Sequence, residues 1–536
     1  MQPQRKDSPS FFDPKTLIAV AAVAIVYFGW QSYLQKKYPG YGQVQSEKAA
    51  TTSDKTTAEG ELAKTSAASA VDSKSEVMAP AEVKTFTFAD EKVSFVLSSQ
   101  GMGLKDFTVT NYQDKKDKAN IKIGDSELGG LFEMRWPGST RGLNFHLVEQ
   151  GPGHFVGTAQ VGETTIKREL KYNKDNSSFS NTIWISNPND EIKNGFSLII
   201  PEKIDVPESS SFLFPSYEHQ DFFVAHNGGK HDFVNFSNAK ENVVEVFPTA
   251  SLASVSSQYF AAAVVDKSEV MPEVRVSSEY QARNAMAELV YKPVQLKPEM
   301  VFTGVFYAGP KAIDLLKAVD PELVNIIDFG WSSIIARPLL YVMKAFHSVV
   351  GNWGFAIILL TLLVRLCVLP FNIMSMRSMK AMQKVQPLIQ SIREKYKDDP
   401  MRLNQEMMAV MKQNGANPMG GCLPMLLQIP IFFALYRVIG SSIELYNSPF
   451  IFWINDLSSH DKFYVLPVVS AIVMYLQQKM TPSTMDPTQA KIMAFMPVVF
   501  SLFMLQLPSG LTLYMAVSTL FGVIQQYFIM RDTKKA

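Results

Sequence analysis

Cysteines and catalytic motifs are scarce in this 536-residue chain, and each scarcity excludes a class of protein. The only two cysteines, Cys367 and Cys422, lie in apolar segments, where a structural disulfide framework has no place. The chain has no His-Glu-x-x-His motif, no Gly-x-Ser-x-Gly motif and no phosphate-binding loop. The spacing of His219, His226 and His231 matches no zinc-ligand pattern. The sequence therefore predicts that the protein is not an enzyme and holds neither a metal nor another cofactor.

A strong charge of either sign is also missing. The formal net charge is +1, and no basic stripe with interleaved aromatic residues occurs, so nucleic acid is not an expected partner. Polarity is instead distributed very unevenly along the chain, with long apolar runs concentrated after residue 328. The length and this asymmetry predict more than one domain.

The N-terminus has the layout of a secretion signal but lacks a cleavage site. Basic residues precede an apolar run from residue 17 to residue 30, and bulky aromatic side chains end that run where small residues would be needed. We therefore expect a cytoplasmic tail and an uncleaved transmembrane anchor over residues 1–32. Residues 33–82 are rich in Ser, Thr, Ala, Lys and Glu, which predicts a flexible linker outside the membrane.

Residues 83–325 contain many short segments of alternating polarity, such as 84–88, 106–110 and 181–185. Clusters of Gly, Asn, Asp and Pro separate them, as turns separate strands. This pattern predicts an all-β sandwich, with one buried face per sheet, rather than a parallel α/β layout.

The apolar runs after residue 328 predict a membrane α-helical bundle. Residues 326–350 mix aromatic, apolar and polar side chains around Pro338, which suits an amphipathic helix lying in the membrane interface. With the N-terminal anchor, the runs make six transmembrane helices, and the five after the anchor are expected at residues 351–371, 417–440, 463–479, 492–507 and 511–530.

Lysine and arginine set the orientation of these spans. Basic residues crowd the connection 372–416, flank the connection 480–491 and recur in the tail 531–536, so these segments belong in the cytoplasm. The connection 441–462 has a single lysine and belongs outside, with the β-domain. Six spans, with both termini in the cytoplasm, place every connection on the side that its lysine and arginine content predicts.

One charged residue, Arg365, lies inside the apolar span 351–371. A cation at that depth usually faces a protein interior or a hydrated cavity. The alternative is that its long side chain reaches the headgroups. Polar residues of several spans could line one hydrated groove with Arg365, or could instead form hydrogen bonds between helices: Thr361, Gln428, Ser470, Ser518, Gln525 and Gln526.

Two further features concern the membrane and the cytoplasm. The span 492–507 is about 24 Å long at ~1.5 Å per residue, so it either thins the bilayer or is extended by flanking residues. The connection 372–416 has a charged helical pattern broken at Asp399 and Pro400, which predicts a helical hairpin. Its many methionines suit contacts with varied apolar partners, or with each other.

Several motifs, in this order along the chain, resemble those of the YidC/Oxa/Alb family of membrane insertases. They run over roughly residues 346–531 and comprise Gly351-Asn352-Trp353-Gly354-Phe355, Val364-Arg365, Asn417-Pro418-Met419-Gly420-Gly421-Cys422-Leu423-Pro424, Gln428-Ile429-Pro430-Ile431-Phe432, Trp453-Ile454-Asn455-Asp456-Leu457-Ser458 and Pro508-Ser509-Gly510-Leu511. The β-domain and linker fit the Gram-negative form of that family, whose β-domain is periplasmic.

The resemblance implies a membrane protein insertase and chaperone of the bacterial inner membrane. Five spans would enclose a hydrophilic groove centred on Arg365, and the hairpin would receive clients. The implied partners are nascent membrane proteins, the Sec translocon, the ribosome or signal recognition machinery, and membrane lipids. The expected groove residues are Arg365, Thr361, Gln428, Phe432, Ser470, Tyr514, Met515, Ser518 and Gln525, and the expected docking residues are Glu406, Asp399 and Met408. Met515 departs from the Tyr-Tyr pair of some members.

Two other classes of function stay open on the residues alone. Arg365 could bind a small anion in a transporter or channel with a periplasmic receptor domain, although no matching halves of an inverted repeat occur. The β-domain could instead serve a membrane-tethered carbohydrate-binding protein.

Overall fold

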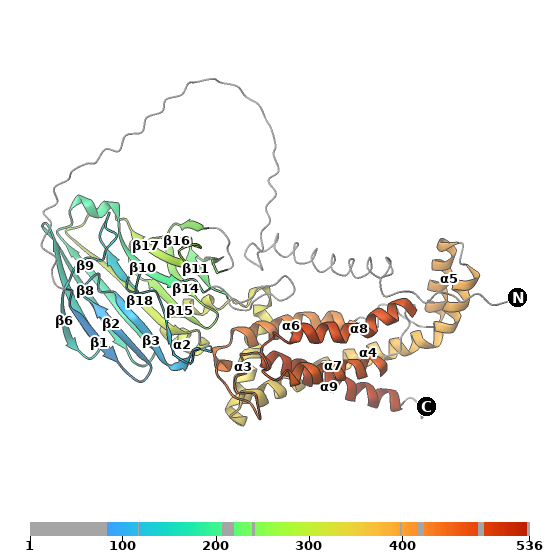
Figure 1. Cartoon of the computed structure of the whole chain (residues 1–536). Helices are drawn as coiled ribbons and strands as arrows, with labels where there is room; N and C mark the ends of the chain where they lie inside the picture. Colours follow the sequence, from blue (N-terminus) through green and yellow to red (C-terminus); the bar gives the residue numbers. More distant parts are fainter. Residues whose placement is uncertain are drawn as a thin grey trace, which may run out of the picture.

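The structure is a computed structural model, and the residues that it describes fall into seven segments: 83–115, 117–205, 219–237, 242–396, 399–414, 423–480 and 487–532. The expected anchor over 1–32 and the expected linker over 33–82 lie outside the described residues. A β-rich domain is followed by a helical region, and the two lie end to end (Figure 1). The predicted division into a β-domain and a helical C-terminal region is confirmed.

The described strands of the β-domain form three antiparallel sheets. The four-stranded sheet has the order β1 (Thr85–Ala89), β2 (Val93–Ser98), β3 (Leu104–Gln113), β4 (Asn120–Lys122). The five-stranded sheet has the order β13 (Val243–Phe247), β16 (Glu273–Glu279), β17 (Asn284–Tyr291), β10 (Phe196–Lys203), β5 (Glu133–Arg135). The nine-stranded sheet has the order β12 (Lys230–Asn235), β11 (Asp221–His226), β14 (Ala250–Ser256), β15 (Phe260–Asp266), β18 (Glu299–Pro310), β9 (Ser178–Ser186), β8 (Thr164–Asn173), β7 (His154–Val161), β6 (His146–Gly151).

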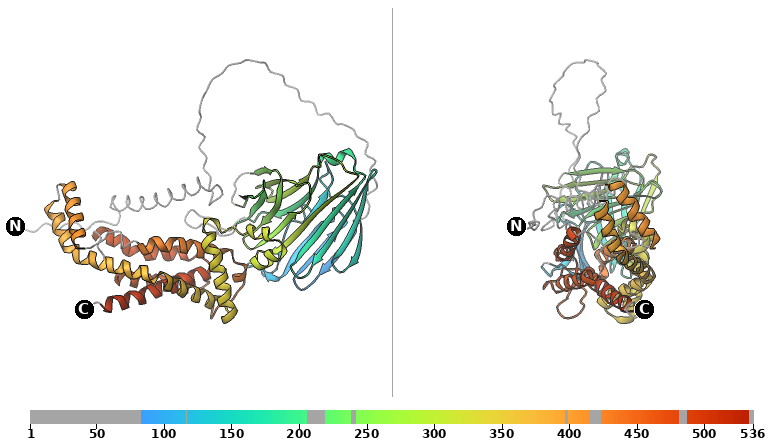
Figure 2. Two further views of the ribbon diagram at one scale, coloured as in Figure 1. Left: turned by 180° about the vertical axis from the view of Figure 1, so that it is seen from behind. Right: turned by 90° about the vertical axis from the view of Figure 1, so that its right-hand side faces the viewer.

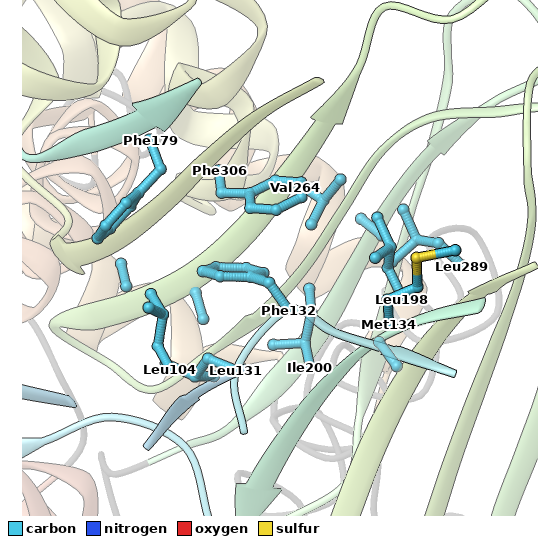
Figure 3. Packing of buried hydrophobic residues seen from close by; sticks show 14 of the residues in the cluster. Leu104, Leu131, Phe132, Met134, Phe179, Leu198, Ile200, Val264, Leu289 and Phe306 are labelled. Atoms are coloured by element: carbon cyan, nitrogen blue, oxygen red, sulfur yellow. The ribbon is translucent and has the colours of Figure 1, made fainter. Parts of the chain in front are cut away.

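Alternation along the strands builds the core of the domain. In β8 every second side chain is buried, as expected for a strand with one covered face. Apolar side chains from the three sheets meet in one cluster, part of which is seen in Figure 3. Phe132, next to β5, stacks on Phe306 of β18 with ring centroids 4.6 Å apart. The sheets are therefore held together mainly by apolar burial.

A single arginine lies inside this core. Arg168 of β8 has 0% of its surface exposed. Its Nε donates to Asn181 Oδ1 of β9 at 2.8 Å, Nη1 donates to the Gly101 carbonyl at 2.6 Å, and Nη2 donates to the Phe132 carbonyl at 2.9 Å. Burial lowers the pKa of the guanidinium to about 9, so it stays charged at neutral pH. Because Gly101 follows β2 and Phe132 precedes β5, one side chain links all three sheets.

We expect Arg168→Met to destabilise the protein by about 3 kcal/mol, because it leaves buried acceptors without a donor. The measurement is the denaturant midpoint of the full-length protein in detergent. The control is Arg141→Met, which changes an exposed arginine and should have an effect within about 0.5 kcal/mol. Equal midpoints for the two variants would contradict the structural role of Arg168.

The helical region continues directly from β18. Its elements are α2 (Ile313–Val319), η2 (Pro321–Ile326), η3 (Gly330–Ser332), α3 (Ser333–Val350), α4 (Trp353–Lys395), α5 (Pro400–Gln413), α6 (Leu423–Ser441), η5 (Ile443–Leu445), α7 (Val465–Met480), α8 (Pro487–Met504) and α9 (Ser509–Asp532). Gly351 ends α3 with φ of 68°, a conformation that favours glycine. Asn352 then caps α4 by accepting from the Phe355 amide at 3.2 Å.

The helices pack side by side, and α3 crosses the end of the bundle that faces the β-domain (Figures 1 and 2). Helix α9 contacts α4, α6 and α7, and α8 contacts α7. Helix α5 packs against the second part of α4, at the end of the bundle away from the β-domain. The long helix α4 therefore connects the two ends of the helical region.

Two described helices are long and apolar enough to cross a membrane, namely Trp353–Lys395 and Ser509–Ile529. The shorter apolar helices are Gln428–Ser441, Val465–Met480 and Ala494–Met504. The count of six spans stays a prediction. Helix α4 runs without a break to Lys395, so the expected boundary between the span 351–371 and the hairpin 372–416 falls inside one helix and stays a prediction. A change from apolar to charged composition does not end a helix when both segments have a helical pattern.

The β-domain contacts the helical region through aromatic rings and polar groups. Tyr446, which follows η5, packs against Tyr259 with ring centroids 4.9 Å apart. Gln258 Nε2 donates to the Gly440 carbonyl at the end of α6, at 2.6 Å. Within the helical region, Lys344 of α3 forms ion pairs with Asp314 of α2 at 2.9 Å and with Glu444 of η5 at 2.7 Å, which fix the end of the bundle that faces the domain. These contacts seat the domain on one end of the bundle.

Candidate functional site

Arg365 lies in the first half of α4, and its guanidinium is directed at α9. Its Nε donates to Ser518 Oγ at 2.8 Å, and its Nη2 also contacts that hydroxyl. The side chain is half-buried, and Ser518 is buried. This contact favours an arginine that faces the bundle interior over one that reaches only for the headgroups.

A second polar contact lies one helical turn from Ser518 along α9. Tyr514, which is buried, accepts a hydrogen bond at Oη from Gln428 Nε2 of α6 at 2.6 Å. Thr361 is buried one turn before Arg365, and its hydroxyl donates to the Ile357 carbonyl of its own helix at 2.7 Å. Helices α4, α6 and α9 thus bring polar groups into one region.

The contact between α4 and α9 repeats seven residues further along both helices. Asn372 Nδ2 of α4 donates to Gln525 Oε1 of α9 at 3.4 Å, and this pair has the same sequence separation of 153 residues as Arg365 and Ser518. Seven residues are close to two helical turns, so residues at this spacing share a face. Two parallel helices packed in one register therefore present a polar seam, which comprises Thr361, Arg365, Asn372, Tyr514, Ser518 and Gln525.

The polar seam has hydrogen-bonding capacity that the described residues do not use. Gln525 Nε2 and Ser375 Oγ are buried and have no hydrogen-bond partner within the described segments. The same holds for Ser470 Oγ on α7. An unsatisfied buried polar group costs about 1–3 kcal/mol, and a buried water or a bound peptide can satisfy it. The arrangement is therefore suited to hold water or polar peptide between apolar helices.

The remaining predicted site residues lie at different distances from the seam. Met515 is half-buried on α9 beside Tyr514, and Phe432 is half-buried on α6 one turn after Gln428. The expected docking residues lie elsewhere, on and next to α5. Asp399 caps α5 by accepting from the Arg402 amide at 3.1 Å. Glu406 is half-buried, and Met408 is 70% exposed.

The sequence analysis missed the continuation of the seam along α4 beyond residue 371. Asn372 and Ser375 were assigned to the hairpin because the composition becomes charged there. Lys380, on the same helix, donates from Nζ to the Ile529 carbonyl of α9 at 3.0 Å. The spacing of seven residues from Arg365 to Asn372 was a usable signal, since it equals the spacing from Ser518 to Gln525.

These features define an integral membrane protein with a β-rich extramembrane domain and a polar seam between apolar helices. Two family models match the chain, "60Kd inner membrane protein" over residues 345–536 and "YidC periplasmic domain" over residues 85–342. The chain belongs to the YidC family of membrane protein insertases, as its motifs predicted.

Relatives named "Membrane protein insertase YidC" support this assignment. The protein of Nitratidesulfovibrio vulgaris is 34% identical over 96% of this chain and 99% of its own length. The proteins of Geobacter sulfurreducens and Syntrophus aciditrophicus are 48% and 43% identical, and the chain spans about half of the length of each, 43% and 53%. A crystal structure titled "Active YidC insertase" aligns with 83% of this chain and 92% of its own, at 20% identity and a TM-score of 0.38.

We expect the contact between Asn372 and Gln525 to behave as a coupled pair. Asn372→Leu should destabilise the protein by about 1–2 kcal/mol, because Gln525 then has no partner. The double variant Asn372→Leu/Gln525→Leu should recover most of this loss, since both polar groups are removed together. Thermal unfolding in detergent measures Asn372→Leu, Gln525→Leu and the double variant, and strictly additive effects would show that the two residues are independent.

Proposed function

We propose that this chain inserts nascent membrane proteins, and helps them fold, through a hydrophilic intramembrane groove centred on Arg365. Membership of the YidC family supports the activity. The contact of Arg365 with Ser518 is the observation that carries the proposed site, because it keeps the cation on the side of α4 that faces α9. The protein works alone or with the Sec translocon in the bacterial inner membrane.

The proposed topology follows from the charge distribution. The N-terminal anchor and the five apolar helices α4, α6, α7, α8 and α9 make six crossings, with both chain termini in the cytoplasm and the β-domain in the periplasm. Helix α5 then lies on the cytoplasmic side, which is consistent with its position at the end of the bundle away from the β-domain (Figure 1).

The first step is capture of the client at the cytoplasmic end. Helix α5 presents exposed Met401 and Met408 beside charged residues, and methionine side chains adapt to apolar partners of varied shape. Glu406 and Asp399 supply acidic groups on the same segment. We infer that this segment receives the emerging client and contacts the ribosome or the signal recognition machinery.

The second step is entry of the client's hydrophilic segment into the seam. A guanidinium has five N–H donors, and Ser518 is a single neutral partner. No described carboxylate forms an ion pair with Arg365 in the segments that the structure covers. A carboxylate at about 4 Å would gain roughly 4 kcal/mol at an effective dielectric constant of about 20. The cost of an acidic residue at the membrane centre is about 3 kcal/mol on the insertion scale, so the attraction is large enough to offset it.

The third step is release of the apolar segment into lipid. Leu363 and Leu366 on α4 and Ile472 on α7 are exposed apolar side chains, which match the lipid tails and the client's own span. Short apolar helices such as Ala494–Met504 would thin the bilayer and shorten the polar segment's path. Attraction to Arg365 and transfer of the apolar segment into lipid supply the free energy of the proposed route, so it requires no nucleotide.

The test uses the reconstituted full-length protein and a single-span client with an acidic outside segment. Arg365→Ala should lower the insertion rate by about tenfold or more, the loss expected for one charge-assisted hydrogen bond of about 1.5–3 kcal/mol. Arg365→Lys should retain part of the activity, because the charge remains.

Two controls sharpen this test. A client whose acidic residues are changed to Asn and Gln should lose much less with Arg365→Ala, and Arg141→Ala on the β-domain should leave both clients unaffected. Unchanged insertion of the acidic client by Arg365→Ala would remove the arginine from the mechanism. Anion uptake by liposomes that contain the protein and no client would favour a transporter instead.

A further inference from the structure

A second polar site, separate from the polar seam, lies where the β-domain meets the helical region. It is a cavity of about 420 Å³ between the β3–β4 hairpin and the connection from residue 442 to residue 464. Lys115 Nζ donates to the Ser458 carbonyl at 3.2 Å, and Asn447 Nδ2 donates to the Gln113 carbonyl at 2.7 Å. These contacts join its two walls, so we refer to it as the junction cavity.

Both carboxylates of the junction cavity are already satisfied by neighbouring donors. Asp456 Oδ1 accepts hydrogen bonds from the backbone N–H of Asn447 at 3.1 Å and from the backbone N–H of Ser458 at 2.9 Å. Asp461 accepts from Trp453 Nε1 at 2.9 Å and from the Leu466 amide at 2.8 Å. These neutral donors stabilise both carboxylates, which keep their negative charges, so neither carboxylate requires a cationic ligand.

Two further cationic side chains line the junction cavity. Lys118 and Lys462 line it from opposite walls, and neither forms an ion pair with any described residue. Asn455 and His460 also line it. Two ammonium groups and an amide that face one polar space are a site for an anion with several acceptor oxygens.

The surroundings of Lys462 indicate where the site lies relative to the membrane. Phe463 is 68% exposed and Phe452 is 86% exposed, and the apolar helix α7 begins at Val465. Exposed aromatic residues and a lysine at the end of an apolar helix are typical of the level of the lipid headgroups. If α7 spans the membrane as proposed, the junction cavity therefore opens at the level of the lipid headgroups. This location does not depend on whether the protein inserts clients.

We propose that the junction cavity binds the phosphate of an anionic phospholipid from the outer leaflet of the inner membrane. Lys118 and Lys462 supply the charged contacts, and Asn455 supplies a neutral donor. Bound lipid would fill the space between the β3–β4 hairpin and the connection before α7. It would thereby hold the β-domain against the membrane surface at the periplasmic end of the seam.

The test compares lipid retention by full-length proteins in detergent, with phosphatidylglycerol as the probe and native mass spectrometry as the measurement. Lys118→Gln/Lys462→Gln should weaken phosphatidylglycerol binding by about tenfold or more, given the contribution of each lysine near a headgroup. The matched control is Lys171→Gln/Lys174→Gln, which removes the same charge from exposed positions in and after β8. Equal binding by the junction variant and the control would overturn the proposal.

Two further arms separate the alternatives. Phosphatidylcholine, which has no net charge, should bind both double variants equally weakly. Excess inorganic phosphate should leave phosphatidylglycerol in place, and its displacement would show that the site serves soluble phosphate and that the lipid assignment is wrong. Arg365→Ala should retain phosphatidylglycerol like the parent protein, so that failure of the insertase proposal and failure of this one are distinguishable.

Discussion

The helical region depends on one constraint, which is that a guanidinium placed among apolar helices needs a polar partner. Ser518 of α9 meets that need for Arg365, and it does so from a register that brings Asn372 opposite Gln525 two turns later. The register also leaves buried donors such as Gln525 Nε2 without a partner among the residues that the structure describes. A bundle optimised only for packing would replace such groups with apolar ones. Their presence is therefore consistent with a seam built to hold water or a passing peptide.

The β-domain shows the opposite use of a buried cation. Arg168 is enclosed by carbonyls and an amide, and its N–H groups are directed at acceptors that belong to three sheets. The side chain is fully buried and acts as a structural link. Arg365 and Arg168 thus have the same chemistry and different roles, because one has a single neutral partner and the other has several.

The two proposed sites lie in different parts of the structure. The polar seam runs along α4 and α9, whereas the junction cavity lies at the end of the bundle that contacts the β-domain. Ion pairs of Lys344 with Asp314 and Glu444 fix that end. A domain fixed there leaves the other end of the seam, near α5, available to an incoming client. This division of the helical region into a seated end and an accessible end is what the proposed route of the client requires.

The sequence by itself determined the β-rich domain, the apolar helices and the family, and it singled out Arg365 as a candidate site residue, because alternation, apolar run length and local motifs are properties of neighbouring residues. It could not determine that α4 continues through residue 371 to Lys395, since a change of composition is not a helix end. Only the tertiary structure decided that Ser518 is the partner of Arg365 and that Asn372 lies opposite Gln525. It also decided that Lys118 and Lys462 share a cavity. In all three pairs the residues are more than a hundred positions apart in the sequence, and only packing brings such residues together.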